Sequence, residues 1–464
     1  MKKMGILGGG ASALFVLGSG FLACSSSSGG GATGFPDGGT GPAKDAASDV
    51  HASDAHGSAD AAHDGETDAG TDAKPHMEAA PPPDSGPTRH VLVTYNGTAN
   101  VANPTTMLAV NLTTGTIDGK ILSADTEAIT DTSNASSAFF LEQTLNNMHI
   151  VGPTTFASEG TYPVGSDPYA VNVVAENQVY VLSYGSNTID VFDLSTPPVD
   201  GGMPSATVDL SSLLQAGDAD GEVEVTAAAY VASSKLLYVV LGNLNFSNTL
   251  DYMGSYDTLC ASTTSTVIAL DTTNNNAIHS LGGTALGGGI TLQGYDPVGP
   301  SGFYYDVAGS RLLILEGGCN PPPTSDGGAP GAVKQRGVEA IDLTTNTSSI
   351  LLDASSQGFP GSMTYIDSSH AVLSFYTSYP TTEAFLWNPM QTTLGTAVTN
   401  APSVFDYDGN GNLVGATLVL GDGGSETTSI VSVSLSSGAV TTLVADPLVL
   451  GMGSIGSVGV WPRP

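Results

Sequence analysis

The stretch DYDGNGNLVG (406–415) has oxygen-bearing side chains at a spacing that could bind a cation. Asp406, Asp408 and Asn410 follow the DxDxNG order of a calcium loop, which supplies roughly six to eight oxygen ligands. Thr417 stands where such a loop needs a bidentate glutamate. Because the stretch aligns with the turns YVASSKLLY (230–238) and YIDSSHAVL (365–373), a hairpin turn is the favoured interpretation and calcium binding the alternative.

A second acidic run, DADGE (218–222), is another candidate cation site through Asp218, Asp220 and Glu222. Histidine chemistry has less support, because the four histidines beyond residue 88 are scattered and the motifs HxH, GxSxG and CxxCH are absent. Those histidines are His90, His149, His279 and His370. The sequence therefore predicts no catalytic residue, no certain cofactor, and calcium as the one cofactor left open.

The first 24 residues read as an export signal. Lys2 and Lys3 precede an apolar, glycine-rich stretch that is too short to span a bilayer. Its end, FLAC, resembles the lipobox of bacterial lipoproteins, which implies that Cys24 is acylated, with palmitate as an expected chain, and anchors the protein in the outer membrane. An ordinary cleaved signal, with Cys24 incidental, is the alternative.

Residues 25–88 consist mainly of Ser, Gly, Ala, Asp, His and Pro, so we expect a disordered acidic tether. The whole chain has 44 acidic and 11 basic side chains and a net charge of −33, which excludes a basic surface for nucleic acid. The expected partners are the membrane, reached through the lipid, and a protein or glycan, bound by a monomer that faces the periplasm or the cell surface.

The remaining part, 89–464, contains a repeat. Runs that alternate apolar and polar residues, typical of half-buried β-strands, end seven times in a short turn. The turns begin at Asn111, Gly152, Asp193, Asp271, Asp342, Asn388 and Ser434. The intervals are 41, 41, 78, 71, 46 and 46 residues, so seven copies share a period of about 41–46, two of them lengthened by insertions. A side-chain oxygen at the turn position can accept from its own backbone and start the turn.

The copy PYAVNVVAENQVYVLSYGSNTIDVFDL (168–194) resembles a repeat of the YVTN family of β-propellers. The resemblance implies an all-β, seven-bladed propeller with four strands a to d per blade, counted from the centre. The first copy starts at HVLVTYN (90–96), which matches strand b, so its strand a is missing. We expect GMGSIGSVGVWP (451–462) to supply that strand and to close the ring.

In such blades the b–c and d–a connections lie on one face, here called the insertion face. The long b–c connections are expected at 244–265, 317–336, 376–383 and 421–429. Long loops on a rigid scaffold usually carry function, although insertions can also accumulate where they disturb least. The aromatic candidates for partner binding on this face are Phe246, Tyr252, Tyr256, Tyr376 and Tyr379. Cys260 and Cys319 fall in two of these loops and are expected to form a disulfide.

These features favour a surface-tethered lipoprotein whose propeller binds a protein or glycan without catalysis. The alternative is a metal-dependent propeller hydrolase, similar to lactonases, or a dehydrogenase that acts at the central channel. Converging carboxylates at that channel would be needed for the alternative, but Asp306 and its equivalents in the innermost strands are too few and too irregular to name a site.

Overall fold

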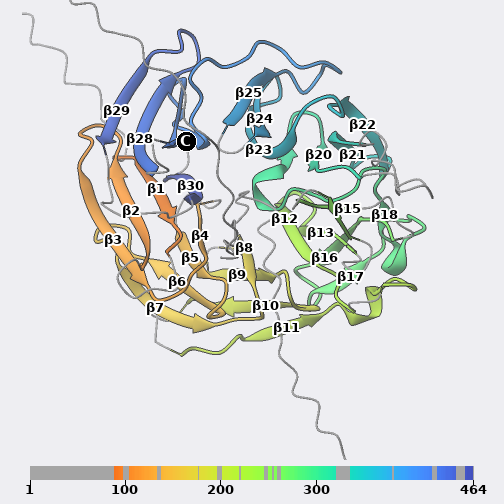
Figure 1. Cartoon of the computed structure of the whole chain (residues 1–464). Coiled ribbons are helices and arrows are strands. Elements are labelled where there is room, and N and C mark those ends of the chain that lie inside the picture. The colour runs from red at the N-terminus through yellow and green to blue at the C-terminus, as the bar shows by residue number, and fades with distance from the viewer. Residues whose placement is uncertain are drawn as a thin grey trace, which may run out of the picture. The chain divides into compact units, whose positions relative to one another are not determined.

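The computed structural model describes residues 88–97, 104–132, 137–175, 177–195, 201–218, 221–244, 249–252, 255–258, 263–319, 335–378, 381–420, 426–445 and 455–462. They form an all-β, seven-bladed β-propeller, as predicted (Figure 1). No helix in the described part of the chain is both long enough and apolar enough to cross a membrane.

The first three blades have four antiparallel strands each. Blade 1 consists of β30 (Ile455–Trp461), β1 (His90–Tyr95), β2 (Thr105–Asn111) and β3 (Ile117–Ser123). Blade 2 consists of β4 (Ala128–Asp131), β5 (Ala138–Glu142), β6 (Asn147–Val151) and β7 (Ser158–Pro163). Blade 3 consists of β8 (Pro168–Ala175), β9 (Gln178–Ser183), β10 (Thr188–Asp193) and β11 (Ala206–Asp209).

Blades 5 and 7 also have four strands, whereas blades 4 and 6 differ in their outer strands. Blade 4 has β12 (Val225–Val231), β13 (Leu236–Leu241), β16 (Thr266–Asp271) and β17 (Ala277–His279), and β18 (Ile290–Thr291) also pairs with β16. Blade 5 has β19 (Phe303–Asp306), β20 (Arg311–Glu316), β21 (Gly337–Asp342) and β22 (Thr347–Asp353). Blade 6 has β23 (Phe359–Asp367), β24 (His370–Ser378) and β25 (Thr381–Trp387), and blade 7 has β26 (Val404–Tyr407), β27 (Asn412–Leu420), β28 (Glu426–Ser434) and β29 (Val440–Ala445).

Smaller elements lie in the connections. These are the hairpin β14 (Thr249–Tyr252) and β15 (Ser255–Thr258) and the 3₁₀ turns η1 (Ser211–Leu213), η3 (Leu286–Gly288) and η4 (Pro300–Gly302). Blade 6 has three strands and not the expected four. In the described residues beyond β25, only an isolated bridge between Phe385 and Ala397 stands in place of the fourth strand.

The turn chemistry expected at the ends of the third strands is confirmed. The Oδ1 atom accepts from the backbone N–H two residues later at Asn111 (2.9 Å), Asp193 (2.9 Å), Asp271 (2.9 Å), Asp342 (2.7 Å) and Asn388 (2.9 Å). These bonds stabilise the carboxylate form, so the pKa values of Asp193, Asp271 and Asp342 lie below their usual range. The repeat position is therefore a backbone-turning device in at least five blades.

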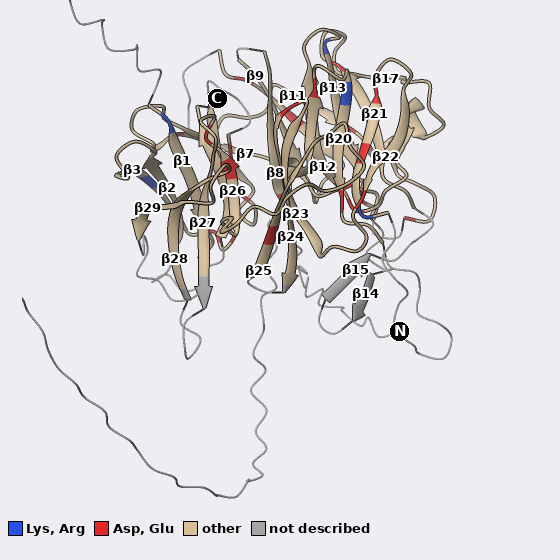
Figure 2. Ribbon diagram, turned by 90° about the horizontal axis from the view of Figure 1, so that it is seen from above, with Lys and Arg blue, Asp and Glu red and all other residues tan. Residues whose placement is uncertain are grey.

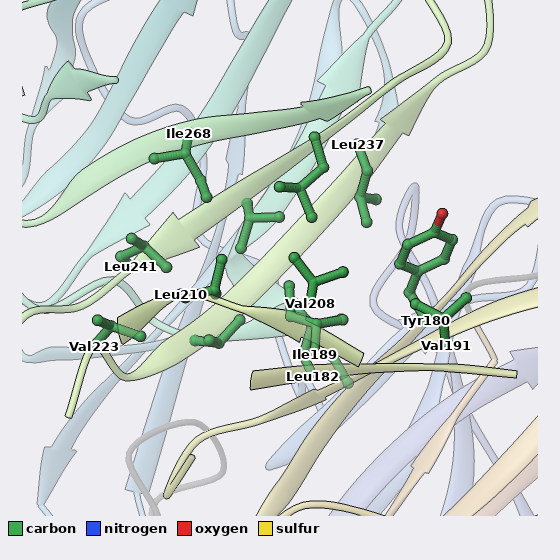
Figure 3. Packing of buried hydrophobic residues seen from close by; sticks show 14 of the residues in the cluster. Tyr180, Leu182, Ile189, Val191, Val208, Leu210, Val223, Leu237, Leu241 and Ile268 are labelled. Atoms are coloured by element: carbon green, nitrogen blue, oxygen red, sulfur yellow. The ribbon is translucent and has the colours of Figure 1, made fainter. Parts of the chain in front are cut away.

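Apolar packing between blades holds the ring together. Seven clusters of buried side chains lie one at each boundary between adjacent blades. At the boundary of blades 3 and 4, Tyr180 and Leu182 face Leu237 and Ile268 (Figure 3). Each such fully buried side chain contributes about 1.5–3 kcal/mol, so the faces of two blades stabilise each other.

The predicted ring closure is confirmed. β30 pairs antiparallel with β1, from His90 opposite Trp461 to Tyr95 opposite Ile455, with one bulge. Phe156, from the c–d turn of blade 2, packs edge-on against Trp461 with ring centroids 6.1 Å apart and lies 4.3 Å from the ring of His90. The closing strand is thus covered by both neighbours of the blade it completes.

Phe156 has φ +51°, a conformation that disfavours residues with a Cβ. Gly115, Asn346 and Gly438 hold the equivalent place in other blades, with the same backbone bond to the residue four earlier. Gly119 makes room for the ring, since a Cβ there would lie 2.5 Å from the Cβ of Phe156. Phe156 therefore combines a strained backbone conformation with a ring that is buried against the closing strand.

Candidate functional site

The inner strands of six blades line a cavity of about 140 Å³. Its walls come from β4, β8, β19 with η4, β23, β26 and β30, with one residue from β24. Hydroxyl-bearing residues dominate the polar part of the lining: Thr130, Thr132, Ser301, Ser362, Thr364, Ser403 and Ser457, together with Tyr169, Tyr304 and Tyr376. This arrangement can donate and accept hydrogen bonds around the ring without adding charge.

Hydrogen bonds between blades fix the inner strands. The Val171 N–H donates to Oδ2 of Asp131 at 2.8 Å, and the Val460 N–H donates to Oδ2 of Asp406 at 2.9 Å. The Thr130 N–H donates to the Ser457 hydroxyl at 2.6 Å. Asp131 and Asp406 are the two charged residues of the lining, and both are bound to a neighbouring inner strand.

The three tyrosines of the lining are held by further aromatic or strand contacts. Tyr169 is buried and lies 5.6 Å, ring to ring, from Tyr184, while Tyr304 lies 5.9 Å from Tyr365. Tyr376 pairs with Phe359 and Thr382 near the insertion-face end of β24. The three tyrosines are therefore held in fixed positions in the cavity wall.

The sorting of connections onto one face is confirmed by contacts between them. The Gln143 amide in a b–c connection donates to Asp167 in a d–a connection at 3.0 Å, and the Gly242 N–H donates to the Glu224 carbonyl at 2.8 Å. Figure 2 shows the ends of β24, β25 and β27 reaching the same side of the molecule. In the described residues, b–c and d–a connections thus lie side by side on the same face.

Carboxylates gather on this face at the mouth of the channel. Asp167, Glu224 and Asp296 stand at the entry to the inner strands of blades 3, 4 and 5, with φ values of +54°, +39° and +58°. Burial and the neighbouring Glu222 and Asp125 raise the pKa of Asp167 to about 6, although its bond from Gln143 opposes the shift. Tyr169, which lines the cavity, has a raised pKa caused by burial and by Asp167 and Asp296.

Two further acids, Glu127 in blade 2 and Glu316 in blade 5, lie near the same group of carboxylates. Burial, with Asp167 and Asp125, raises the pKa of Glu127 to about 7. Glu316 is fully buried with no hydrogen-bond partner for either carboxylate oxygen, and burial with Glu339 and Asp296 nearby raises its pKa well above the usual range. Burial therefore disfavours the ionised form of Glu316.

The candidate cation ligands lie in hydrogen-bonded positions. Asp406 belongs to β26 and accepts from Tyr407 and Val460, while Asp408 accepts from the backbone of Asn410 at 2.7 Å and of Asn412 at 3.0 Å. In the described residues no three His, Cys, Asp or Glu side chains are grouped so that they could hold a metal ion. Calcium binding at 406–410 gains no support from this geometry and stays a prediction.

At the second candidate, the Asp218 N–H donates to the Gln215 carbonyl at 3.1 Å, and Glu222 contributes to the field at Asp167. Asp220 lies outside the described residues. The inner-strand Asp306 is buried and holds Arg311 at 2.8 Å and the Tyr365 hydroxyl at 2.9 Å, which places it in a structural network.

The structure describes only part of the predicted partner surface. Tyr376 lines the cavity, and Tyr252 and Tyr256 pair with Ser255 and Asp251 in the β14–β15 hairpin. Phe246, Tyr379, Cys24 and Cys260 lie outside the described residues. Cys319 is buried and disulfide-bonded, and its bond to Cys260 stays a prediction.

Strand pairing extends into two of the expected b–c loops, which are therefore shorter than predicted, while residues 379–380 and 421–425 lie outside the described residues. β24 and β25 continue their pairing to Ser378 opposite Thr381, and β27 and β28 continue to Leu420 opposite Glu426. The β-branched residues of TTE and ETTS extend the strands beyond the apolar core, where alternation no longer reveals them. The hydroxyls of the cavity were also missed, because single Ser and Thr residues on short inner strands leave no pattern.

No protein-family model matches this chain, and no curated protein matches it either. Among solved structures it is similar to a proposed 6-phosphogluconolactonase from Bacteroides uniformis, at 13% identity and TM-score 0.45 over 80% of this chain and 99% of the other. It is also similar to the Kuenenia stuttgartiensis hydrazine synthase (11%, TM-score 0.47, 73% and 89%) and to BamB from Moraxella catarrhalis (11%, 0.39, 75% and 81%). The activities of these proteins carry no argument for this chain at such similarity.

Proposed function

We propose that this chain is a lipid-anchored, non-catalytic glycan receptor, whose propeller binds a saccharide at the channel mouth on the insertion face. The observation that carries the proposal is the lining of the cavity, where three tyrosines stand among seven Ser and Thr residues. Saccharides present hydroxyls in every direction and apolar C–H faces, so hydroxyls and aromatic rings suit them. The same set suits a folded protein partner less well, because the cavity is recessed within the ring.

Binding without catalysis is supported by the state of the acids in the lining. Asp131 and Asp406 both accept from backbone amides of the neighbouring blade, which gives them a structural role. The lining contains no His, Cys or Lys, so a general base or nucleophile of those types is not placed beside a bound sugar.

The anchor and tether complete the proposal. A lipid on Cys24 would hold the protein in the outer membrane, and about 64 tether residues would reach on the order of 45 Å. Mass spectrometry of the Cys24 peptide should find acyl chains, and Cys24→Ser should move the protein from the membrane to the soluble fraction. A Cys24 peptide without acyl mass would overturn the anchor and leave the binding proposal to its own test.

Binding is tested with the full-length protein in detergent on an array of glycans, followed by calorimetry on the glycans retained. Tyr376→Ala should lower affinity about tenfold or more, because it removes an aromatic wall of the cavity. The matched control is Tyr230→Ala in β12, whose ring packs in the cluster between blades 3 and 4 and is not in the cavity lining. Retention of no glycan, or turnover of a bound glycan into product, would contradict the proposal.

A further inference from the structure

Resting on the proposed glycan site, we infer that the cavity selects the uncharged, terminal unit of a saccharide and rejects anionic sugars such as phosphorylated or uronic acid units. The charge of the lining carries this inference. Among the described residues of the lining there is no Lys, Arg or His, and the two charged groups are the carboxylates of Asp131 and Asp406.

A bound anion would therefore meet no counter-charge. Asp406 has both oxygens occupied by amides, from Tyr407 at 2.8 Å and Val460 at 2.9 Å. Asp131 is half-buried, lies at the cavity wall and accepts from the Val171 N–H, so its carboxylate adds negative charge beside a bound ligand. An anionic sugar would place its charge beside these carboxylates, and the repulsion between like charges would weaken its binding.

Charged groups around the cavity also disfavour anionic sugars. Asp167 and Asp296 lie in the connections that lead into β8 and β19, and both are close enough to Tyr169 of the lining to influence it electrostatically. In the described part of the chain Arg336 is the cation near the channel mouth, and it lies over the Phe359 ring and donates to the Gly317 and Gln357 carbonyls. An approaching anion is thus repelled before it reaches the cavity, over a Debye length of about 8–10 Å.

The size of the cavity limits how much of a glycan can enter. Its volume of about 140 Å³ is well below the roughly 300–1,000 Å³ typical of sites that enclose a drug-sized molecule. One sugar ring can be accommodated, while the rest of a chain must lie outside on the insertion face. The site therefore binds the end of a chain and not its middle.

The test uses the full-length protein and matched pairs of sugars that differ in charge: methyl glucoside with glucose 6-phosphate, and galactose with galacturonate. The probes bind in calorimetry or compete with an array-selected glycan. We expect the uncharged member of each pair to bind at least about tenfold more tightly. Asp131→Asn keeps the acceptor for Val171 and should reduce this ratio to about threefold or less, whereas Glu159→Gln, on an exposed position of β7, should leave it unchanged.

Salt provides a second readout that does not depend on the variant being folded. Raising the salt from 50 mM to 500 mM should strengthen binding of the anionic member and leave that of the uncharged member unaltered. Tighter binding of the anionic member, or equal binding of both, overturns the selection while the receptor function stands. Absence of binding by every sugar and array glycan removes the proposed function itself.

Discussion

The backbone N–H of Val460 donates a 2.9 Å hydrogen bond to the carboxylate of Asp406, which joins the closing strand of blade 1 to the inner strand of blade 7. β30 also pairs with β1, so this strand is hydrogen-bonded both within blade 1 and to blade 7. The same carboxylate lies in the cavity lining, which couples ring closure to the shape of the site.

Asp406→Ala should destabilise the propeller by about 2–3 kcal/mol, because it leaves the amide of a buried residue, Val460, without its charged acceptor. Urea denaturation followed by tryptophan fluorescence measures the change. The control is Asp193→Ala at an exposed turn, where the cost should stay below about 1 kcal/mol. Equal effects of the two variants would argue against a closing role for Asp406.

Deletion of residues 455–464 should abolish cooperative unfolding. It exposes the edge of β1 and removes Ile455, Val460 and Trp461 from two apolar clusters. Calorimetry should show a broad or absent transition, and a synthetic peptide covering 453–464 should restore it in trans. Removal of residues 463–464 alone should leave the transition in place. A truncated chain that melts like the full-length protein would be incompatible with closure by β30.

Phe156→Asn exchanges a strained aromatic for the residue that blade 5 has at the equivalent position, Asn346. Relief of the positive φ gains about 1–2 kcal/mol, while loss of a buried Phe costs about 3–5 kcal/mol. The net expectation is a loss of about 2 kcal/mol in the free energy of unfolding. Thr155→Ala, on the exposed neighbour, should change it by less than about 0.5 kcal/mol. A stabilised Phe156→Asn variant would mean that the strain outweighs the packing.

The crowded mouth should make the protein less stable as the pH rises from about 4.5 to 7. Glu127 and Asp167 have folded-state pKa values of about 7 and 6, above those of the unfolded chain, so the folded state binds more protons in this range. Their contribution to stability is present below the unfolded-state pKa and is lost as the pH rises through the folded-state values. Denaturation at pH 5 and at pH 7.5 measures it.

Glu127→Gln should flatten this dependence, because the neutral amide replaces the group that titrates near pH 7. Glu159→Gln, at an exposed position, is the matched control and should retain the wild-type slope. A protein that became more stable between pH 5 and pH 7.5, with an unchanged slope in Glu127→Gln, would show that other groups dominate.

The architecture could be predicted from the sequence because the blades repeat the same pattern of strands and turns. Asp193, Asp271 and Asp342 each end a third strand and turn the backbone, so their spacing counts the blades. Closure followed from one missing strand before β1. Turns of this kind depend on a few consecutive residues, so they can be recognised without a structure.

The site could not be read in the same way. Thr130, Ser362 and Ser457 belong to three different blades, and they converge only because the ring brings their inner strands together. The carboxylates at the mouth likewise meet through the connections of successive blades, each of which looks like an ordinary turn. Tyr376 was named as a partner-binding residue, but its place in the cavity wall depends on the extension of β24, which the alternation did not reveal.

The pairing of β30 with β1 also dictates an order of events during synthesis. Blade 1 lacks its inner strand until β30 has left the ribosome. Until then β1 presents an unsatisfied edge, and the ring cannot be complete. The ring of a nascent chain can therefore close only after residues 455–461, which lie 360 positions or more beyond the end of β1 at Tyr95, have been synthesised.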